Sequence, residues 1–304
     1  LTGSGTLSGA GNAAGNGIYV IGAKWIDSTF AGTMQDGSQG NLGIVKTGAD
    51  TLTLNGTVNY TGPTTVNTGK LALIEPVSLD NSPTINLSSN GVIDVSGRAD
   101  GTLNLGNTKV QTLTGVGTVN GSLVEAANSF VRAGLGNLTV TNTATFNGNL
   151  SLQLNRTNAF THSEILATGF TMAGPLTVTN VGPALQGGDS FVLFNHSVSG
   201  FTATNLPALS AGMIWTNKLS VNGTIAVVAT VNTNPTNITA VVSGNLLQLS
   251  WPADHTGWTL QVETNALNTG IRTNWVDVPG SAAVNSTNIT IDVTKPTVFY
   301  RLKF

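Results

Sequence analysis

The sequence predicts an all-β protein, in which a β-solenoid is followed by a small antiparallel β-sandwich. Three observations predict this fold. Many short segments carry apolar residues at alternate positions, several sequence units recur, and no stretch shows helical apolar spacing for more than two turns. The chain of 304 residues contains 37 Gly and is also rich in Asn and Thr, so that turn and strand formers dominate its composition.

Short alternating segments fill residues 1–228, the part that we expect to form the solenoid. Each segment places its apolar residues on one face of a strand, and that face is expected to be buried. Gly, Asn and Ser separate the segments, as is typical of turns. The clearest examples are residues 51–54, 70–73, 84–87, 92–95, 138–140 and 150–154.

Recurring units indicate that these segments stack on one another. Residues 1–9 are nearly repeated at 113–121, and Asn-Gly between apolar residues occurs several times. Asn-Gly is also typical of hairpin turns, so an antiparallel sandwich or barrel is the alternative. A closed sheet of this length would be unusually large, whereas a solenoid simply adds rungs. With about 20–25 residues in a rung we expect roughly nine or ten rungs and a rod on the order of 45 Å long.

The last part of the chain predicts a separate module. Residues 229–236 are interpreted as a linker, because they are polar and contain Pro235, which cannot donate a hydrogen bond to a sheet. Residues 237–304 then predict a small β-sandwich with Trp251, Trp258, Trp275 and Tyr300 in its core. The expected strands are residues 238–242, 246–251, 258–262, 275–278, 289–293 and 298–302.

The composition argues against several classes of function. Charged residues make up only 9% of the chain and the formal net charge is -2, so no basic face is available to neutralise phosphates and nucleic acid is not an expected partner. No apolar run approaches the roughly 20 residues of a membrane helix, so we expect no membrane insertion. The chain has no Cys, which excludes disulfides and thiolate metal sites.

The titratable residues form no catalytic or metal-binding pattern in the sequence. His162, His196 and His255 are isolated, and each is interpreted as a surface turn residue. We therefore expect no enzyme activity, no metal and no cofactor. The charged residues are interpreted as dispersed, solvated single charges, although two carboxylates on adjacent rungs could still meet. They include Asp27, Asp36, Lys46, Asp50, Lys70, Glu75, Asp80, Asp94, Arg98, Asp100, Lys109, Glu125 and Arg132.

Residues 43–71 carry a motif that resembles the autotransporter-associated β-strand repeat. That repeat contains Lys-x-Gly-x-x-x-Leu-x-Leu, then Tyr-Thr-Gly, then Thr-x-Val-x-x-Gly-x-Leu, and all three parts are present here in order. Residues 187–225 are also similar to the end of such passenger regions. The motif residues are Lys46, Gly48, Leu52, Leu54, Tyr60, Gly62, Val66, Gly69 and Leu71.

The resemblance implies a right-handed parallel β-helix displayed outside a bacterial cell. Residues 247–252, 274–275 and 299–302 resemble parts of a fibronectin type III-like C-terminal module, which we expect in place of the outer-membrane barrel usual in that family. Because the sequence starts at Leu1 without an initiator Met, we expect that a signal peptide has been removed. The expected location is extracellular or on the surface of a bacterium.

The function that the sequence favours is a structural subunit of a surface fibre or filament, whose partners are other copies of itself. A solenoid has open ends, and unpaired N–H and C=O groups there pair with another chain unless they are capped. We expect the opening strand, with Leu1, Thr2 and Leu7, to make this contact. One alternative is a monomeric adhesin or glycan-binding passenger, with Trp25 or Trp215 stacked on surface glycans. A second is a β-helix polysaccharide-active enzyme, which needs two carboxylates within about 10 Å on one face.

Overall fold

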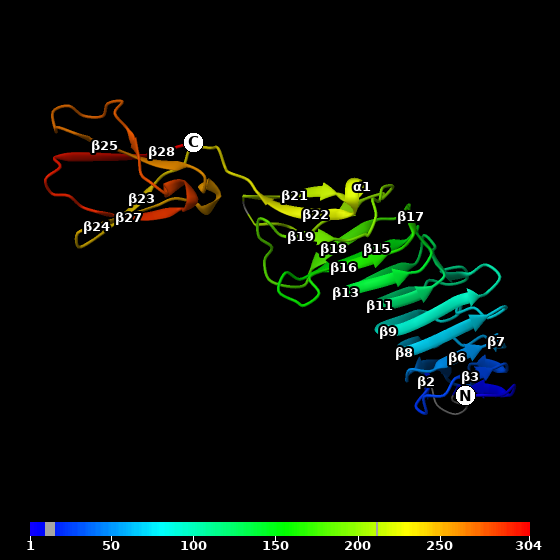
Figure 1. Ribbon diagram of the computed structural model, residues 1–304. Coiled ribbons are helices and arrows are strands. Elements are labelled where there is room, and N and C mark those ends of the chain that lie inside the picture. Colours follow the sequence, from blue (N-terminus) through cyan, green and yellow to red (C-terminus); the bar gives the residue numbers. More distant parts are fainter. Residues whose placement is uncertain (10–15, 211) are drawn as a thin grey trace. The chain divides into compact units, whose positions relative to one another are not determined.

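The computed structural model describes residues 1–9, 16–210 and 212–304 and is nearly all β (Figure 1). Its residues cluster into two compact units. The first contains residues 1–185, 189–208 and 215–226, and the second contains residues 186–188, 209–214 and 227–304. The predicted order of a solenoid followed by small antiparallel sheets is confirmed.

The first unit is a parallel β-solenoid of about eight turns, slightly fewer than the nine or ten expected. Its strands lie side by side in sequence order, because each strand pairs in parallel with the equivalent strand of the next rung (Figure 1). The largest sheet follows the order β2 (Asn16–Ile21), β5 (Asn41–Lys46), β8 (Thr64–Ile74), β9 (Thr84–Gly97), β11 (Thr112–Asn120), β13 (Phe130–Val140), β15 (Asn149–Leu154), β18 (Leu176–Asn180) and β20 (Thr204–Asn205), with β3 (Ser28–Phe30), β6 (Thr51–Leu54) and β16 (Ser163–Leu166) attached.

Two smaller parallel sheets complete the rungs. They form because each rung contributes a short strand before it returns to the largest sheet. The first contains β1 (Thr6–Ser8), β4 (Thr33–Gln35) and β7 (Thr57–Val58), and the second contains β10 (Thr102–Leu105), β12 (Ser122–Glu125), β14 (Thr143–Phe146) and β17 (Gly169–Met172).

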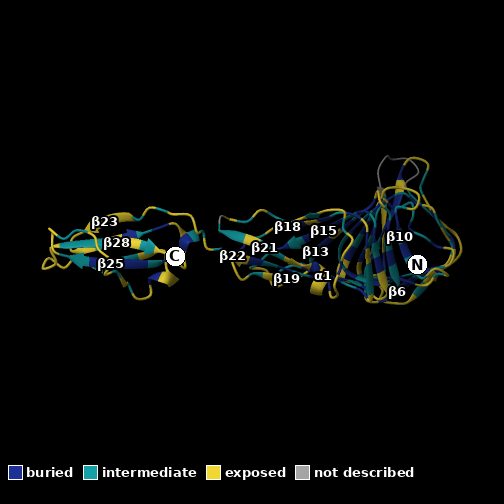
Figure 2. Ribbon diagram, turned by 90° about the horizontal axis from the view of Figure 1, so that it is seen from above, coloured by how far each residue is buried: buried dark blue, intermediate teal, exposed yellow. Residues whose placement is uncertain are grey.

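Stacked aliphatic side chains form the core of the solenoid. Along one ladder the registered positions are Leu52, Leu71, Ile93, Val119 and Val140, and all are at most 1% exposed. Full burial of each such side chain contributes roughly 1.5–3 kcal/mol. Figure 2 shows the result: buried positions follow the strands, and exposed residues gather in the turns.

An antiparallel sheet follows the last rungs of the solenoid. It contains β19 (Ser190–Val192), β22 (Thr224–Ala229) and β21 (Met213–Lys218), and β19 pairs antiparallel with β22. The Asn-Gly pair that precedes β22 ends a short helix, α1 (Leu219–Asn222), and does not form a hairpin turn. Gly223 adopts the left-handed conformation that ends this helix, with φ of 76°.

The second unit contains two three-stranded antiparallel sheets that share one hydrophobic core. Leu249 and Trp251 come from the first sheet and the residue after it, and Leu260 comes from the second. The first sheet has the order β23 (Thr239–Ser243), β24 (Leu246–Ser250) and β27 (Ser286–Thr290), and the second has the order β26 (Val276–Asp277), β25 (Thr259–Asn265) and β28 (Thr297–Lys303).

Candidate functional site

Lys46, the last residue of β5, is fully buried inside the solenoid. Its Nζ donates hydrogen bonds to the carbonyl oxygens of Thr47 at 2.8 Å and Gly48 at 3.0 Å, and to Asp50 Oδ1 at 3.2 Å. A buried ammonium group needs an acceptor for each of its three protons, and this corner supplies them. The interpretation of Lys46 and Asp50 as solvated single charges is therefore wrong.

The glycines of the repeat motif allow backbone segments to approach one another closely. Gly48 and Gly69 have positive φ, of 77° and 70°. A Cβ atom on Gly69 would lie 2.2 Å from the Gly48 carbonyl oxygen and 2.9 Å from Lys46 Nζ, and one on Gly62 would lie 2.1 Å from the Leu42 carbonyl oxygen. Only glycine fits these positions without a backbone shift.

The other motif residues fill the core of successive rungs. The Tyr60 hydroxyl lies 2.6 Å from Thr64 Oγ1, and burial raises the pKa of Tyr60 well above its usual range. The motif residues thus build the core of the solenoid. The buried aliphatic members are Leu52, Leu54, Val66 and Leu71.

A group of charged side chains gathers around Arg98, after β9. Its Nε and Nη2 donate to Asp100 Oδ1 at 3.0 Å and Oδ2 at 3.2 Å, and Nη1 donates to the Val77 carbonyl oxygen. The hydrogen bond to Asp100 raises the pKa of Arg98, and the charges of Glu75 and Asp80 act in the same direction. The solenoid therefore brings together three carboxylates that the sequence shows as dispersed.

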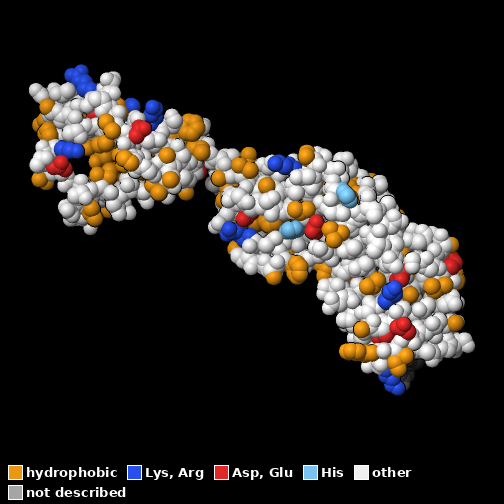
Figure 3. Space-filling model, viewed as in Figure 1, with side chains coloured by type: hydrophobic (Ala, Val, Ile, Leu, Met, Phe, Trp, Pro, Cys, Tyr) orange, Lys and Arg blue, Asp and Glu red, His pale blue; other side chains and the backbone are white. Residues whose placement is uncertain are grey.

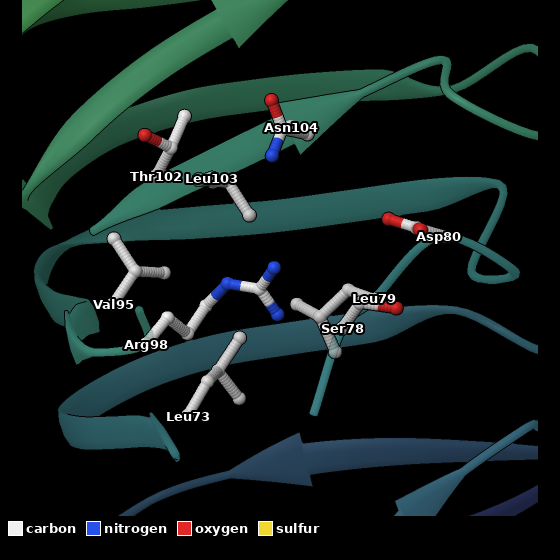
Figure 4. Close-up of a pocket in the computed structure, with 9 residues that line it drawn as sticks. All are labelled: Leu73, Ser78, Leu79, Asp80, Val95, Arg98, Thr102, Leu103 and Asn104. Carbon is white, nitrogen blue, oxygen red and sulfur yellow. The ribbon is translucent and has the colours of Figure 1, made fainter. Parts of the chain in front are cut away.

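The cavity beside Arg98 is small (Figure 4). The guanidinium group turns toward the segment that carries Leu79 and Asp80, and the remaining space is about 10 Å³. That volume accommodates about one water molecule. The arrangement fits an ion-pair network that stabilises a turn, and it leaves no room for a sugar ring.

Strands β1 and β2 lie at one end of the solenoid, which we call the N-terminal edge (residues 1–9 and 16–28). In the described part of the chain each of these strands pairs on one side only, β1 with β4 and β2 with β5. Their other sides present backbone N–H and C=O groups that can bind an added strand. Leu7, one of the expected assembly residues, pairs with Met34 of β4 on the next rung.

The N-terminal edge also exposes large apolar side chains. Leu1 and Thr2, the other expected assembly residues, line a groove of about 360 Å³. The Tyr19 hydroxyl donates a hydrogen bond to the Ser8 carbonyl oxygen at 3.0 Å, which connects β2 to β1. The exposed fractions are 44% for Ile18, 40% for Tyr19, 64% for Val20, 72% for Trp25 and 67% for Ile26.

The aromatic residues predicted for the sandwich core occupy different environments. Trp251 is buried in the core and Tyr300 packs against it. Trp258 is buried, and its Nε1 donates to the Asn232 carbonyl oxygen at 2.7 Å. Trp275 is not in the core, because its ring instead stacks on the Arg301 guanidinium group, whose Cζ lies 4.3 Å from the ring centroid.

The three histidines also differ from one another. His255 is buried, so its interpretation as a surface residue is wrong. Its ring nitrogens lie 2.8 Å from the Asn234 carbonyl oxygen and 2.7 Å from Asp254 Oδ1, and both contacts raise its pKa. His162 is half-buried, which lowers its pKa, and His196 is exposed. Within residues 1–9, 16–210 and 212–304, no three His, Asp or Glu side chains come close enough to hold a metal ion.

Glu125, which the sequence shows only as a single acid, lies inside the solenoid. It occupies a core position between Leu105 and Phe146 on the neighbouring rungs, and it is fully buried. Neither carboxylate oxygen has a hydrogen-bond partner. Burial raises its pKa to about 8; the backbone N–H groups of Gly148 and Val131 oppose this shift but lie outside full hydrogen-bond geometry. The sequence did contain a signal for this burial: in an alternating strand, Glu125 falls on the same face as Leu123, two residues earlier.

One family model matches the chain. It describes the passenger-associated transport repeat and covers residues 44–73, which include all nine residues of the motif. No curated protein matches the sequence. In the described residues no helix is long and apolar enough to cross a membrane. The matched repeat lies within the parallel solenoid, and the two together make the chain similar to a passenger-like β-helix.

Proposed function

We propose that this protein is an extracellular structural subunit that assembles with copies of itself through the N-terminal edge. The passenger-associated repeat supports a secreted or surface location. The observation that carries the proposal is the pair of edge strands: among the described residues β1 and β2 each pair on one side only, and Ile18 and Val20 of β2 are exposed. Edge strands with exposed apolar residues and few charges are sites of strand addition.

A second copy is the occupant that the fold favours for this edge. At the other side of the solenoid the largest sheet ends in β20, which has only two residues, whereas β2 has six, so the N-terminal edge offers the longer strand for pairing. Two N-terminal edges related by a two-fold axis pair antiparallel, and each covers the apolar side chains of the other.

Polar side chains that connect successive rungs support a load-resisting role. Lys70 Nζ donates to Asp94 Oδ2 at 3.0 Å, Asn120 Nδ2 donates to Asp94 Oδ1 at 2.9 Å, and Thr141 Oγ1 donates to Asn120 Oδ1 at 3.0 Å. This ladder joins four rungs in addition to the backbone hydrogen bonds. Side-chain ladders of this kind add to the stability of stacked β-structure, which suits a structural subunit.

A charge on the N-terminal edge tests the proposal. Val20→Lys places an ammonium group on β2 at an exposed position, so the fold is retained while strand addition is opposed. Val293→Lys, at a valine that is 91% exposed in the second unit, is the matched control. We expect the wild-type and control proteins to form filaments and Val20→Lys to remain dispersed. Deletion of residues 1–9 is a weaker test, because it uncovers β4 as a new edge.

A monomeric glycan-binding passenger is the second candidate, and exposed Trp25 beside the groove of the N-terminal edge favours it. This alternative predicts a dispersed wild-type protein that binds glycans and loses binding in Trp25→Ala. Catalysis has no part in the proposed role. We also propose a fibronectin type III-like relationship for residues 237–304, supported by buried Trp251 between two antiparallel sheets.

A further inference from the structure

The sandwich of the second unit has a core that is open along one side. Strand β28 ends its sheet, and in the described part of the chain it pairs only with β25. Strand β23 ends the other sheet. Tyr300 and Leu302 of β28 face the core but are only partly buried. One edge of β28 therefore presents unpaired backbone groups next to incompletely covered apolar side chains.

Two cavities lie along this side, and together we call them the core trough. One, of about 390 Å³, is lined mainly by apolar residues of both sheets and by residues 291–295, which precede β28, and the other, of about 340 Å³, lies between residues 235–238 and β28. Tyr300 lines both cavities. In Figure 3 apolar side chains gather around a hollow on this module. The trough runs beside β28, so a strand added to β28 would lie next to it.

The sequence of β28 is complementary to itself. In an antiparallel pair centred on Tyr300, Val298 lies opposite Leu302 of the other copy, and Phe299 lies opposite Arg301. The alternation of β28 places Val298, Tyr300 and Leu302 on the core face of both copies. Centring the pair on Arg301 would instead place two guanidinium groups opposite each other, and shifting it by one residue would turn apolar side chains to the polar face.

We propose that a second copy of this chain pairs with β28 across a two-fold axis centred on Tyr300. The two sheets then continue into one, and the core-facing side chains of each β28 cover the core trough of the other copy. A peptide edge is the expected occupant rather than a small apolar molecule, because β28 offers a row of backbone groups as well as apolar surface.

This contact deepens the proposed function, because a filament needs two interfaces. A two-fold contact at the N-terminal edge alone closes as a dimer. A second two-fold contact at β28 extends the dimers into an open chain of subunits. The β28 contact itself stands on its own observations, and it persists when the N-terminal edge is blocked.

Single cysteines report the register directly, since the natural chain has no Cys. All variants carry Val20→Lys, so that the N-terminal edge does not contribute. Tyr300→Cys is expected to form a disulfide-linked dimer with itself under mild oxidation, since residues directly opposite in a sheet lie close enough for a disulfide. Val298→Cys is expected to link to Leu302→Cys when the two proteins are mixed, and much less to itself. Val293→Cys, on an exposed loop, measures linking by random collision.

A change of charge at the ends of the proposed β28–β28 pair gives an independent test of dimerisation that leaves Tyr300 unchanged. In the proposed register Thr297 lies opposite Lys303 of the other copy, while within its own chain it pairs with neutral Asn265. Thr297→Lys is expected to weaken dimerisation roughly three- to thirty-fold in sedimentation, because it creates two like-charge pairs, and Thr297→Glu is expected to keep or strengthen it. Circular dichroism confirms that both variants fold.

The outcomes separate this proposal from the proposed function. Self-linking of Tyr300→Cys above the Val293→Cys level, with opposite effects of the two Thr297 variants, supports the β28 contact. A folded monomer in the Val20→Lys background, with no linking above the collision level, overturns it. Filaments that persist in Val20→Lys would contradict the contact at the N-terminal edge but not the β28 contact.

Discussion

Lys46 Nζ lies 3.2 Å from Asp50 Oδ1, and both side chains are at most 2% exposed. This ion pair lies at the corner that joins β5 to β6, within the matched repeat. Because the carbonyl oxygens of Thr47 and Gly48 accept the other protons, the ammonium group is fully satisfied without water. The repeat thus specifies a buried charged corner within the solenoid.

Removing the ammonium group is expected to be strongly destabilising. Lys46→Met leaves the Asp50 carboxylate buried without its counter-ion, which costs about 3–5 kcal/mol of unfolding free energy. Lys70→Met is the matched control, because Lys70 is 41% exposed in its pair with Asp94 and such pairs contribute about 0–1 kcal/mol. Chemical denaturation measures both. Equal losses in the two variants would contradict the assignment of Lys46 as a buried structural residue.

Close backbone contact between rungs predicts a similar contrast between two glycines. A Cβ atom on Gly56 would lie 2.0 Å from the Gly32 carbonyl oxygen, whereas one on Gly5 meets nothing within 4 Å. Gly56→Ala is expected to cost at least about 1–3 kcal/mol, as in overpacked interiors, and Gly5→Ala is expected to be nearly neutral. Thermal unfolding of both variants provides the measurement, and a neutral Gly56→Ala would show that the rungs are less closely spaced.

Glu125 predicts an unusual pH dependence. Its pKa is raised from 4.5 when unfolded to about 8 when folded, so the folded state holds a proton that the unfolded state has lost between these values. The contribution of Glu125 to the free energy of unfolding is therefore largest below pH 4.5. It falls as the pH rises and reaches its minimum above about pH 8. The loss amounts to a few kcal/mol.

Two substitutions of Glu125 isolate this effect. Glu125→Gln removes the titration and Glu125→Leu also restores an aliphatic core position next to Leu105 and Phe146. Both variants are expected to be more stable than the wild type at pH 8.5, and the difference is expected to shrink toward pH 4.5. Denaturation series across this range measure it. A wild-type stability that rises from pH 5 to pH 8, relative to Glu125→Gln, would contradict a buried protonated carboxyl group.

The solenoid itself could be predicted from the sequence, because strand alternation and recurring units are local signals. Asn and Gly at intervals mark the turns, and Leu52 and Leu71 of the motif fall in register in the core. The structure differs from the prediction where contacts between distant residues decide whether a side chain is buried. A lysine such as Lys46 is usually exposed, and only its partners across the turn make its burial favourable.

Contacts between distant segments also account for the other differences. Glu75 and Asp80 approach Arg98 only because the rungs stack, whereas Asp100 is its neighbour in the sequence. Trp275 was expected in the sandwich core from alternation alone, but Arg301 offers its ring a cation on the outer face. The edge strands could not be predicted either, because no local sequence pattern distinguishes an edge strand such as β28 from an internal strand.

Electron microscopy of the purified protein tests the central claim most directly. The chain is expected to form filaments at concentrations where Val20→Lys forms only dispersed particles, with Val293→Lys forming filaments as the wild type does. Dispersed wild-type particles that are no larger than those of Val20→Lys, under every condition that keeps the protein folded, would contradict self-assembly through the N-terminal edge.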